Sequence, residues 1–174
     1  MLITPHENNE IWTEIANEIM RFNPCWVGYT SYTANLGAIR IISKKVRQLD
    51  RNIKQVIGGV HATLEKNILD KLPDVDYSVR REGEFPMLSL VNGKPAHTIE
   101  GVMSRTNNGL QDNGITGAIA DIDALPFPER DKLWGLSGKE KETIDVSYIC
   151  SIRGCPYKCT YCASPFHWER DKTR

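Results

Sequence analysis

The sequence has no apolar run that approaches the length needed to span a membrane. Its first ten residues, MLITPHENNE, have neither the basic start nor the apolar core of a secretory leader. We therefore expect a soluble protein of the cytoplasm, a compartment in which thiols stay reduced.

The chain also lacks an excess of charge of either sign. Its 174 residues include 22 Lys and Arg and 22 Asp and Glu, so the formal net charge is zero. Because nucleic-acid-binding proteins usually carry a basic face, this balance does not indicate a nucleic-acid partner. There is no internal repeat and no low-complexity tract. The length suits one ordinary domain or two smaller ones.

Cysteine is scarce and unevenly placed. Of the five cysteines, three form a CxxxCxxC motif at Cys155, Cys159 and Cys162. The odd number and the crowding argue against a framework of disulfides. Cys25 and Cys150 lie in apolar, strand-like surroundings, and we expect them to be small core residues rather than ligands.

The clustered cysteines predict a metal site, because thiolates select zinc, copper(I) or iron–sulfur clusters. Gly154 and Pro156 allow the loop to curl so that the three thiols converge. A structural zinc site closes its shell with a fourth protein ligand, whereas a cluster held by three cysteines leaves one iron open. His167 lies five residues after Cys162, so a zinc-binding module formed by the three cysteines and His167 is the alternative.

With Tyr161 directly before its last cysteine, the loop resembles the signature of the radical SAM superfamily. The resemblance implies that Cys155, Cys159 and Cys162 hold a 4Fe-4S cluster, and that S-adenosylmethionine binds the open iron with Tyr161 near its adenine. It also implies that one electron, from a partner donor, cleaves the sulfonium to a 5′-deoxyadenosyl radical that abstracts hydrogen from a substrate. No catalytic side chain is identified in this chain.

Strand-like and helical patterns alternate three times before this loop. The expected strands are residues 26–33, 55–57 and 77–79, and the expected helices are residues 11–20, 35–49, 64–72 and 85–91. The first strand has little polar alternation, which predicts burial on both faces. The alternation predicts a doubly wound α/β sheet, whose ligands lie beyond the carboxyl ends of the strands.

Three loops at these strand ends, residues 27–33, 58–63 and 80–84, resemble those of the cobalamin-binding domain that precedes the radical SAM barrel in one subfamily. In that subfamily they surround the nucleotide tail and lower face of the corrin. Two residues depart from the pattern, since Thr30 replaces a common serine and Arg81 a common glycine. The resemblance implies that the cofactor-binding residues are Thr30, Thr33, Gly58, Gly59, His61, Thr63, Glu82, Gly83 and Glu84. Each loop alone would also suit an ordinary strand-to-helix turn.

The domain organisation follows from both resemblances. Residues 1–95 are expected to form a partial, flavodoxin-like cobalamin-binding domain, and residues 96–142 a hairpin and a proline-rich linker. Residues 143–174 would begin a radical SAM (β/α) barrel, with its first strand at 143–151 before the cluster loop. A cobalamin-type sheet needs about five strands, so the three found here predict an unpaired edge on the strand at 26–33.

The expected function is that of a fragment of a cobalamin-dependent radical SAM enzyme. The family implies radical-based methyl transfer or cyclisation on a small-molecule or cofactor-pathway substrate. Alone, this fragment is expected to be inactive, because solvent would quench a radical in an open site. A zinc-binding structural module and a non-catalytic cobalamin-binding piece stay open. Methylthiotransferases carry an additional cysteine-bound cluster in their N-terminal domain, and only Cys25 lies in that region, which argues against them.

Overall fold

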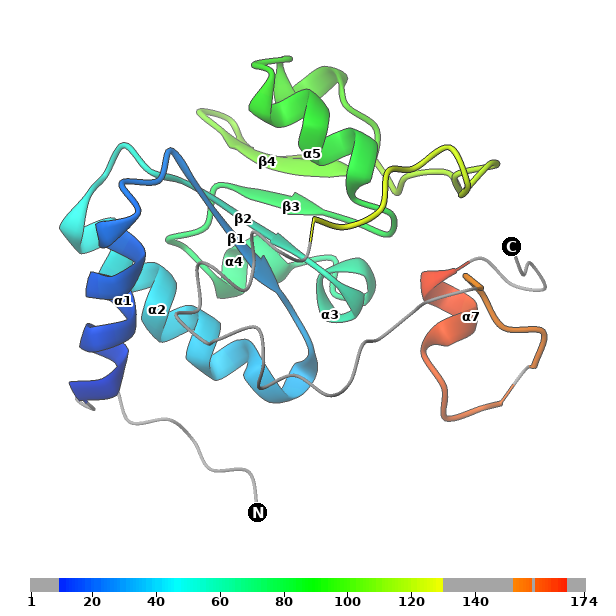
Figure 1. The fold of residues 1–174 in the computed structure, drawn as a ribbon, viewed down its shortest axis with the longest axis horizontal. Coiled ribbons are helices and arrows are strands. Elements are labelled where there is room, and N and C mark those ends of the chain that lie inside the picture. The colour runs from blue at the N-terminus through cyan, green and yellow to red at the C-terminus, as the bar shows by residue number, and fades with distance from the viewer. Residues whose placement is uncertain (1–9, 130–151, 158, 169–174) are drawn as a thin grey trace. The chain divides into compact units, whose positions relative to one another are not determined.

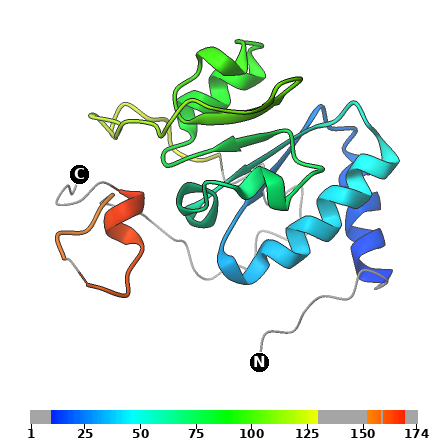
Figure 2. The same cartoon turned by 180° about the vertical axis from the view of Figure 1, so that it is seen from behind.

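The computed structural model describes residues 10–129, 152–157 and 159–168 (Figures 1 and 2). The chain divides into two compact units, Met1–Ala118 and Ile119–Arg174. The described part of the second unit contains one helix, α7 (Ser164–His167). The expected strand at 143–151 and Cys150 lie outside the described residues. No helix in the described ranges is long and apolar enough to cross a membrane.

The first unit follows the predicted alternation of strands and helices. Its elements are α1 (Glu10–Arg21), β1 (Trp26–Thr30), α2 (Leu36–Leu49), β2 (Lys54–Gly58), α3 (Val60–Leu64), α4 (Ile68–Lys71), β3 (Tyr77–Val79), α5 (Glu84–Val91), β4 (Val102–Thr106) and β5 (Gly109–Asp112). The helix expected at 64–72 is instead two short helices, α3 and α4. They separate at Glu65, whose backbone is extended and whose carboxylate accepts a hydrogen bond from the Asn67 amide at 3.3 Å.

The sheet has the strand order β1-β2-β3-β4-β5. The strands β1, β2 and β3 are parallel, β4 is antiparallel to β3, and β5 is antiparallel to β4. The doubly wound α/β class is therefore confirmed, and so is the expected hairpin. However, β4 pairs with β3, so the hairpin extends the sheet to five strands rather than only connecting it to the linker. Among the described strands β1 lies at the edge, as predicted.

Helices cover both faces of this sheet, with α5 on one side and α2 and α4 on the other (Figure 1). Successive residues of β2 point to opposite faces because the side-chain period of a strand is two. Ile57 packs with Ile39 of α2 in one core cluster, and Val56 packs with Leu90 of α5 in another. Burial on the two faces of β2 thus fixes its register.

The prediction that residues 26–33 are buried on both faces is wrong. In β1, Val27 is buried, but Gly28 and Thr30 are exposed. Val27 packs with Ala16 of α1 and with Val46 of α2, so helices cover that face. Cys25, expected in the core, is also exposed, because it precedes β1 at the edge of the sheet.

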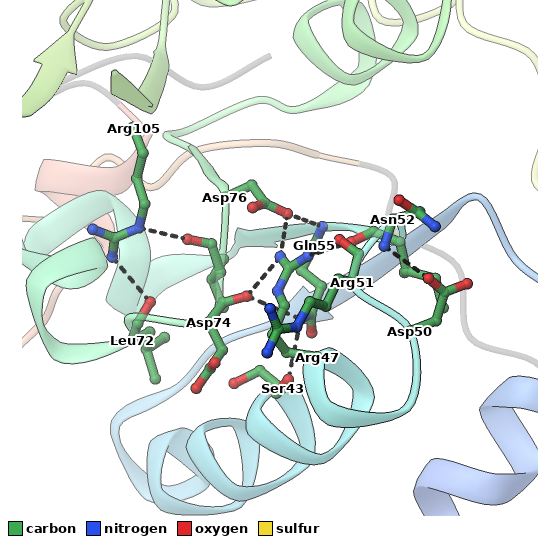
Figure 3. A network of polar contacts seen from close by, with 12 residues as sticks. Ser43, Arg47, Asp50, Arg51, Asn52, Gln55, Leu72, Asp74, Asp76 and Arg105 are labelled. Carbon is green, nitrogen blue, oxygen red and sulfur yellow. Dashed lines mark hydrogen bonds and ion pairs between the residues drawn. The ribbon is translucent and has the colours of Figure 1, made fainter. Parts of the chain in front are cut away.

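A network of polar contacts lies at the amino-terminal ends of the parallel strands (Figure 3). Arg47 of α2 donates to the Asp76 carboxylate at 2.6 Å and to the Asp74 carbonyl at 3.0 Å. The fully buried Gln55 donates from its backbone to Asp76 at 2.7 Å and from its amide to the carbonyls of Asp74 and Ser43 at 2.9 and 3.1 Å. Because these buried and half-buried polar groups are hydrogen-bonded to one another, we interpret this end of the sheet as structural. The candidate loops lie at the opposite, carboxyl-terminal ends of these strands.

Candidate functional site

The carboxyl ends of β1, β2 and β3 lie next to one another on the same side of the sheet, because these strands are parallel. The nine candidate cofactor-binding residues lie at these ends or in the loops that follow. We name the loops by order: the first loop is 30–35, the second loop is 58–63 and the third loop is 80–84. The parallel order brings together residues that the sequence separates by up to about fifty positions.

Ser31 bonds the first loop directly to the second. Its backbone N–H and its hydroxyl both donate to the Gly58 carbonyl, at 2.8 and 2.7 Å. Its carbonyl accepts from the His61 N–H at 3.1 Å, and its hydroxyl accepts from the Ala62 N–H at 3.0 Å. Ser31 is fully buried. Sequence reasoning did not select this residue, because a serine between threonine and tyrosine carries no spacing signal.

The two glycines of the second loop differ in what surrounds them. Gly59 has a φ of 92°, and a Cβ there would lie 2.9 Å from the backbone nitrogen and oxygen of Ser31. Both facts require glycine. A Cβ on Gly58 would meet the Val79 carbonyl at an ordinary 3.6 Å. The close backbone approach expected at this glycine pair is therefore an approach of Gly59 to the first loop.

His61 and Thr33 make a second link between these loops, with 3.0 Å between His61 Nδ1 and Thr33 Oγ1. The other ring nitrogen, Nε2, is buried and has no hydrogen-bond partner in the described part of the chain. A buried polar atom without a partner costs stability. Nε2 is thus a group that a ligand can satisfy. The hydroxyl-bearing Thr30 and Thr33 are exposed.

Thr63 joins the second loop to the third. Its hydroxyl donates to the Gly59 carbonyl at 3.0 Å and accepts from the Arg81 N–H at 2.9 Å. Thr63 is buried, so it ties loops together instead of presenting a free hydroxyl. Arg81 has a φ of 68°, in the region that favours glycine. The departure noted at this position is therefore an arginine held in a glycine-type backbone conformation.

The hairpin that extends the sheet anchors the third loop. Arg80 is buried and forms two hydrogen bonds, at 2.9 and 2.8 Å, with the carboxylate of Asp112 at the end of β5. The Thr116 hydroxyl donates to the Arg80 carbonyl at 2.5 Å. Within this loop Glu82 is buried and Glu84 is exposed. Sequence reasoning missed Asp112 and Thr116, since neither lies in a recognisable motif.

The cysteine loop belongs to the second unit. Cys155 and Cys162 are half-buried and Cys159 is exposed, and all three are free. The Cys162 N–H donates to the Cys159 carbonyl at 3.1 Å, and the Cys162 sulfur accepts from the Ser164 N–H at 3.4 Å. Across the described ranges, no three His, Cys, Asp or Glu side chains lie close enough to hold one ion. The thiols match an iron–sulfur cluster in chemistry, but they are not gathered around one point.

The two other residues considered with this loop differ in exposure. Tyr161 is 92% exposed. His167 is buried, and its ring lies edge-on to Trp168 with 4.6 Å between the centroids. Within the described residues, His167 does not join the cysteines in one group of metal-ligating side chains.

An open groove of about 480 Å³ lies elsewhere on the first unit. It is lined by Leu36, Gly37, Arg40, Asp70, Lys71, Leu72 and Pro73, at the start of α2 and around α4. None of the candidate residues lines it. We therefore assign it no role.

Comparison with known proteins places the three loops in one family domain. The family model described as "B12 binding domain" matches residues 3–91, a range that includes all three. The uncharacterized methyltransferase PH0819 from Pyrococcus horikoshii is 27% identical over 164 residues, covering 91% of this chain and 36% of that protein. The anaerobic magnesium-protoporphyrin IX monomethyl ester cyclase of Cereibacter sphaeroides is 24% identical over 174 residues, covering 92% of this chain and 28% of that protein.

The fold is also similar to a solved structure. The radical S-adenosylmethionine methyltransferase TsrM from Kitasatospora setae, solved with cobalamin and a [4Fe-4S] cluster bound, superposes with a TM-score of 0.63 at 16% identity. The alignment covers 93% of this chain and 35% of TsrM. This chain thus spans between 28% and 36% of the length of these three proteins. Because the two relatives are named as a methyltransferase and a cyclase, the zinc-binding module is not favoured.

Proposed function

The chain belongs to the B12-binding domain family, and from this premise we propose that its first unit binds cobalamin at the carboxyl edge of the sheet. One observation carries the proposal: Ser31 and Thr63 hydrogen-bond the three loops to one another, so that the loops at three strand ends are held together. Ordinary strand-to-helix turns do not need such links, whereas a large flat ligand needs a fixed surface.

The residues of these three loops fit a corrinoid by their chemistry. Thr30 and Thr33 offer exposed hydroxyls, which donate or accept hydrogen bonds. His61 offers the buried Nε2, which lacks a partner within the described residues, and its orientation is fixed by Thr33. We propose that these groups bind and orient the ligand, with Gly83 and Glu84 at the third loop. When bound, cobalamin supplies a carrier for a methyl group at its cobalt.

We further propose that the whole protein is a cobalamin-dependent radical SAM enzyme. Cys155, Cys159 and Cys162 would hold a 4Fe-4S cluster, and the exposed ring of Tyr161 would contact the adenine of S-adenosylmethionine. When bound, the cluster would supply the electron that cleaves S-adenosylmethionine. Three thiols on one loop and the names of the relatives, a methyltransferase and a cyclase, support this assignment. The reaction would be a radical methyl transfer or a cyclisation on a small molecule, with an external electron donor.

The proposed organisation assigns one segment to each task. We propose that residues 1–95 form the cobalamin-binding part, that 96–142 form a hairpin and linker, with the hairpin strands β4 and β5 added to the sheet of the first unit, and that 143–174 begin the radical SAM part. A non-catalytic cobalamin-binding piece is the second candidate, because the described thiols are not gathered around one centre. Either candidate requires cobalamin binding.

Titration of the full chain with hydroxocobalamin tests the shared requirement. We expect saturable binding, and we expect His61→Ala to weaken it roughly tenfold, because one hydrogen bond to the ligand is lost. His97→Ala is the matched control, since His97 is exposed in the turn Ala96–Thr98, outside the three loops. Absence of saturable binding by the unaltered chain would reject the proposed function.

A further inference from the structure

Ser31 lies in the first loop but offers a ligand no free group, because it is 0% exposed and its hydroxyl is already hydrogen-bonded within the protein. Its backbone and hydroxyl nevertheless make four hydrogen bonds to the second loop and the helix it begins, at 2.7 to 3.1 Å. The hydroxyl uses both its donor and an acceptor position. A buried residue with this many contacts between two ligand-facing loops acts on the ligand only through its neighbours.

Those contacts cap the start of α3 from outside its own segment. The first N–H groups of a helix have no partner within the helix, and a side chain just before the helix normally satisfies one of them. Gly59 occupies that position before α3 and has no side chain. Ser31 takes its place, because its carbonyl accepts from His61 and its hydroxyl from Ala62. The beginning of α3 is thus fixed by the end of β1.

The shape of the second loop matches this arrangement. Gly59 has a left-handed backbone, and its Cα faces the Ser31 backbone so closely that a Cβ would lie 2.9 Å from two Ser31 atoms. Thr33 follows Ser31 by two residues, and His61 follows Gly59 by two residues. Thr33 Oγ1 lies 3.0 Å from His61 Nδ1. The distance between the first-loop hydroxyls and the His61 ring is therefore set by the contact of Ser31 with Gly58, Gly59 and Ala62.

We propose that Ser31 is a positioning residue for corrinoid binding: it locks the first and second loops into one preassembled surface without touching the ligand. This inference rests on the proposed cobalamin-binding function. Preassembly matters because ordering a loop at the moment of binding reduces affinity. Ser31 lies outside the set of residues that the family resemblance suggested.

The test compares Ser31→Ala with Ser78→Ala in the full chain. Ser78 is also 0% exposed and lies in the same sheet, on β3, but its hydroxyl has no hydrogen-bond partner among the described residues. In the ligand-free protein, we expect Ser31→Ala to speed amide hydrogen exchange at Ala62, whose N–H loses its acceptor, the Ser31 hydroxyl. With hydroxocobalamin, we expect it to weaken the affinity about tenfold, on the order of 1.4 kcal/mol. Ser78→Ala should change neither quantity.

Two results would overturn the proposal while the unaltered chain still binds hydroxocobalamin. One is Ser31→Ala with unchanged exchange, and the other is faster exchange with unchanged affinity. If the unaltered chain does not bind, the proposed function itself fails, and exchange in the ligand-free protein still reports whether Ser31 ties the loops. Should Ser31→Ala not fold, Ser31→Cys keeps the shape and a weaker donor. It must then bind more weakly than the unaltered chain for the proposal to stand.

Discussion

Gly58 and Gly59 are adjacent in the sequence, but only Gly59 has a left-handed backbone and a backbone neighbour within 3 Å of the position that a Cβ would occupy. We expect Gly59→Ala to lower the free energy of unfolding by at least 1–2 kcal/mol, roughly the strain of the left-handed backbone alone. Gly58→Ala, in ordinary strand geometry, should stay within about 0.5 kcal/mol. Urea unfolding of both variants measures this difference, and equal losses would contradict the geometry.

Tyr29 provides a test of pH dependence. Its hydroxyl donates to the Gln55 side-chain oxygen at 2.5 Å, and burial, the largest cause, raises the pKa of this phenol above its usual value. The folded state therefore holds the proton more tightly than the unfolded chain, whose tyrosines titrate near pH 10. The contribution of Tyr29 to the free energy of unfolding is therefore complete below about pH 10 and is lost as the pH rises above it.

Chemical unfolding at several alkaline pH values checks this expectation. Tyr29→Phe should cost about 1 kcal/mol at neutral pH, because Gln55 loses its donor. The variant should also lose less stability than the unaltered protein between neutral pH and values above pH 10. Burial also raises the pKa of Tyr77, so some alkaline loss should remain. An identical pH dependence in both proteins would show that Tyr29 does not contribute.

At the residue scale, the family resemblance suggested loop residues by their type and order, and the structure shows which of these residues contact one another. Thr33 and His61 were selected from their loops, and the structure brings them together at 3.0 Å. Ser31 was missed because its importance comes from contacts with residues 27 to 31 positions away. Thr63, which the resemblance suggested as a cofactor-binding residue, joins two loops through its hydroxyl. Sequence patterns report residue type and order, whereas these roles depend on pairing across the sheet.

At the element scale, the β4–β5 hairpin supports the third loop through the pair of Arg80 and Asp112. The Arg80 side chain is 7% exposed and that of Asp112 is 39% exposed. We expect Asp112→Ala to destabilise the fold by about 2–3 kcal/mol, somewhat less than for a fully buried pair, because it leaves a buried guanidinium without its carboxylate.

A matched surface pair provides the control for this experiment. In α1, Arg21 Nη1 lies 2.6 Å from Glu18 Oε2, and the two side chains are 77% and 55% exposed. Glu18→Ala should therefore cost less than about 0.5 kcal/mol. Thermal unfolding of both variants makes the comparison. If Asp112→Ala were as mild as Glu18→Ala, the hairpin would not anchor the third loop.

Periodicity predicted these elements well where one face is buried and less well at edges and short helices. The apolar faces of α1 and α2 fixed both helices within a few residues. For β1, composition suggested burial on both faces, but composition does not indicate that helices cover only the face that carries Val27. The partner of the hairpin was also unpredictable, because the pairing of β3 with β4 depends on contacts distant in sequence.

At the scale of the whole molecule, we propose two cofactors for two units of one chain. The strand-end loops of the first unit would take the corrinoid, and the cysteine loop of the second would take the cluster. The fold class was predictable because three alternations of strand and helix have few arrangements. The geometry of the cysteine loop was not, since CxxxCxxC defines a donor set without placing its sulfur atoms.

The most direct measurement is the cofactor content of the full chain after anaerobic reconstitution with iron, sulfide and hydroxocobalamin. We predict that the unaltered protein retains iron, sulfide and corrinoid together. Any one of Cys155→Ala, Cys159→Ala and Cys162→Ala should abolish iron and sulfide binding and leave corrinoid binding intact, while His61→Ala should weaken only corrinoid binding. Unchanged iron and sulfide in a cysteine variant, or zinc in their place in the unaltered protein, would contradict the two-cofactor assignment.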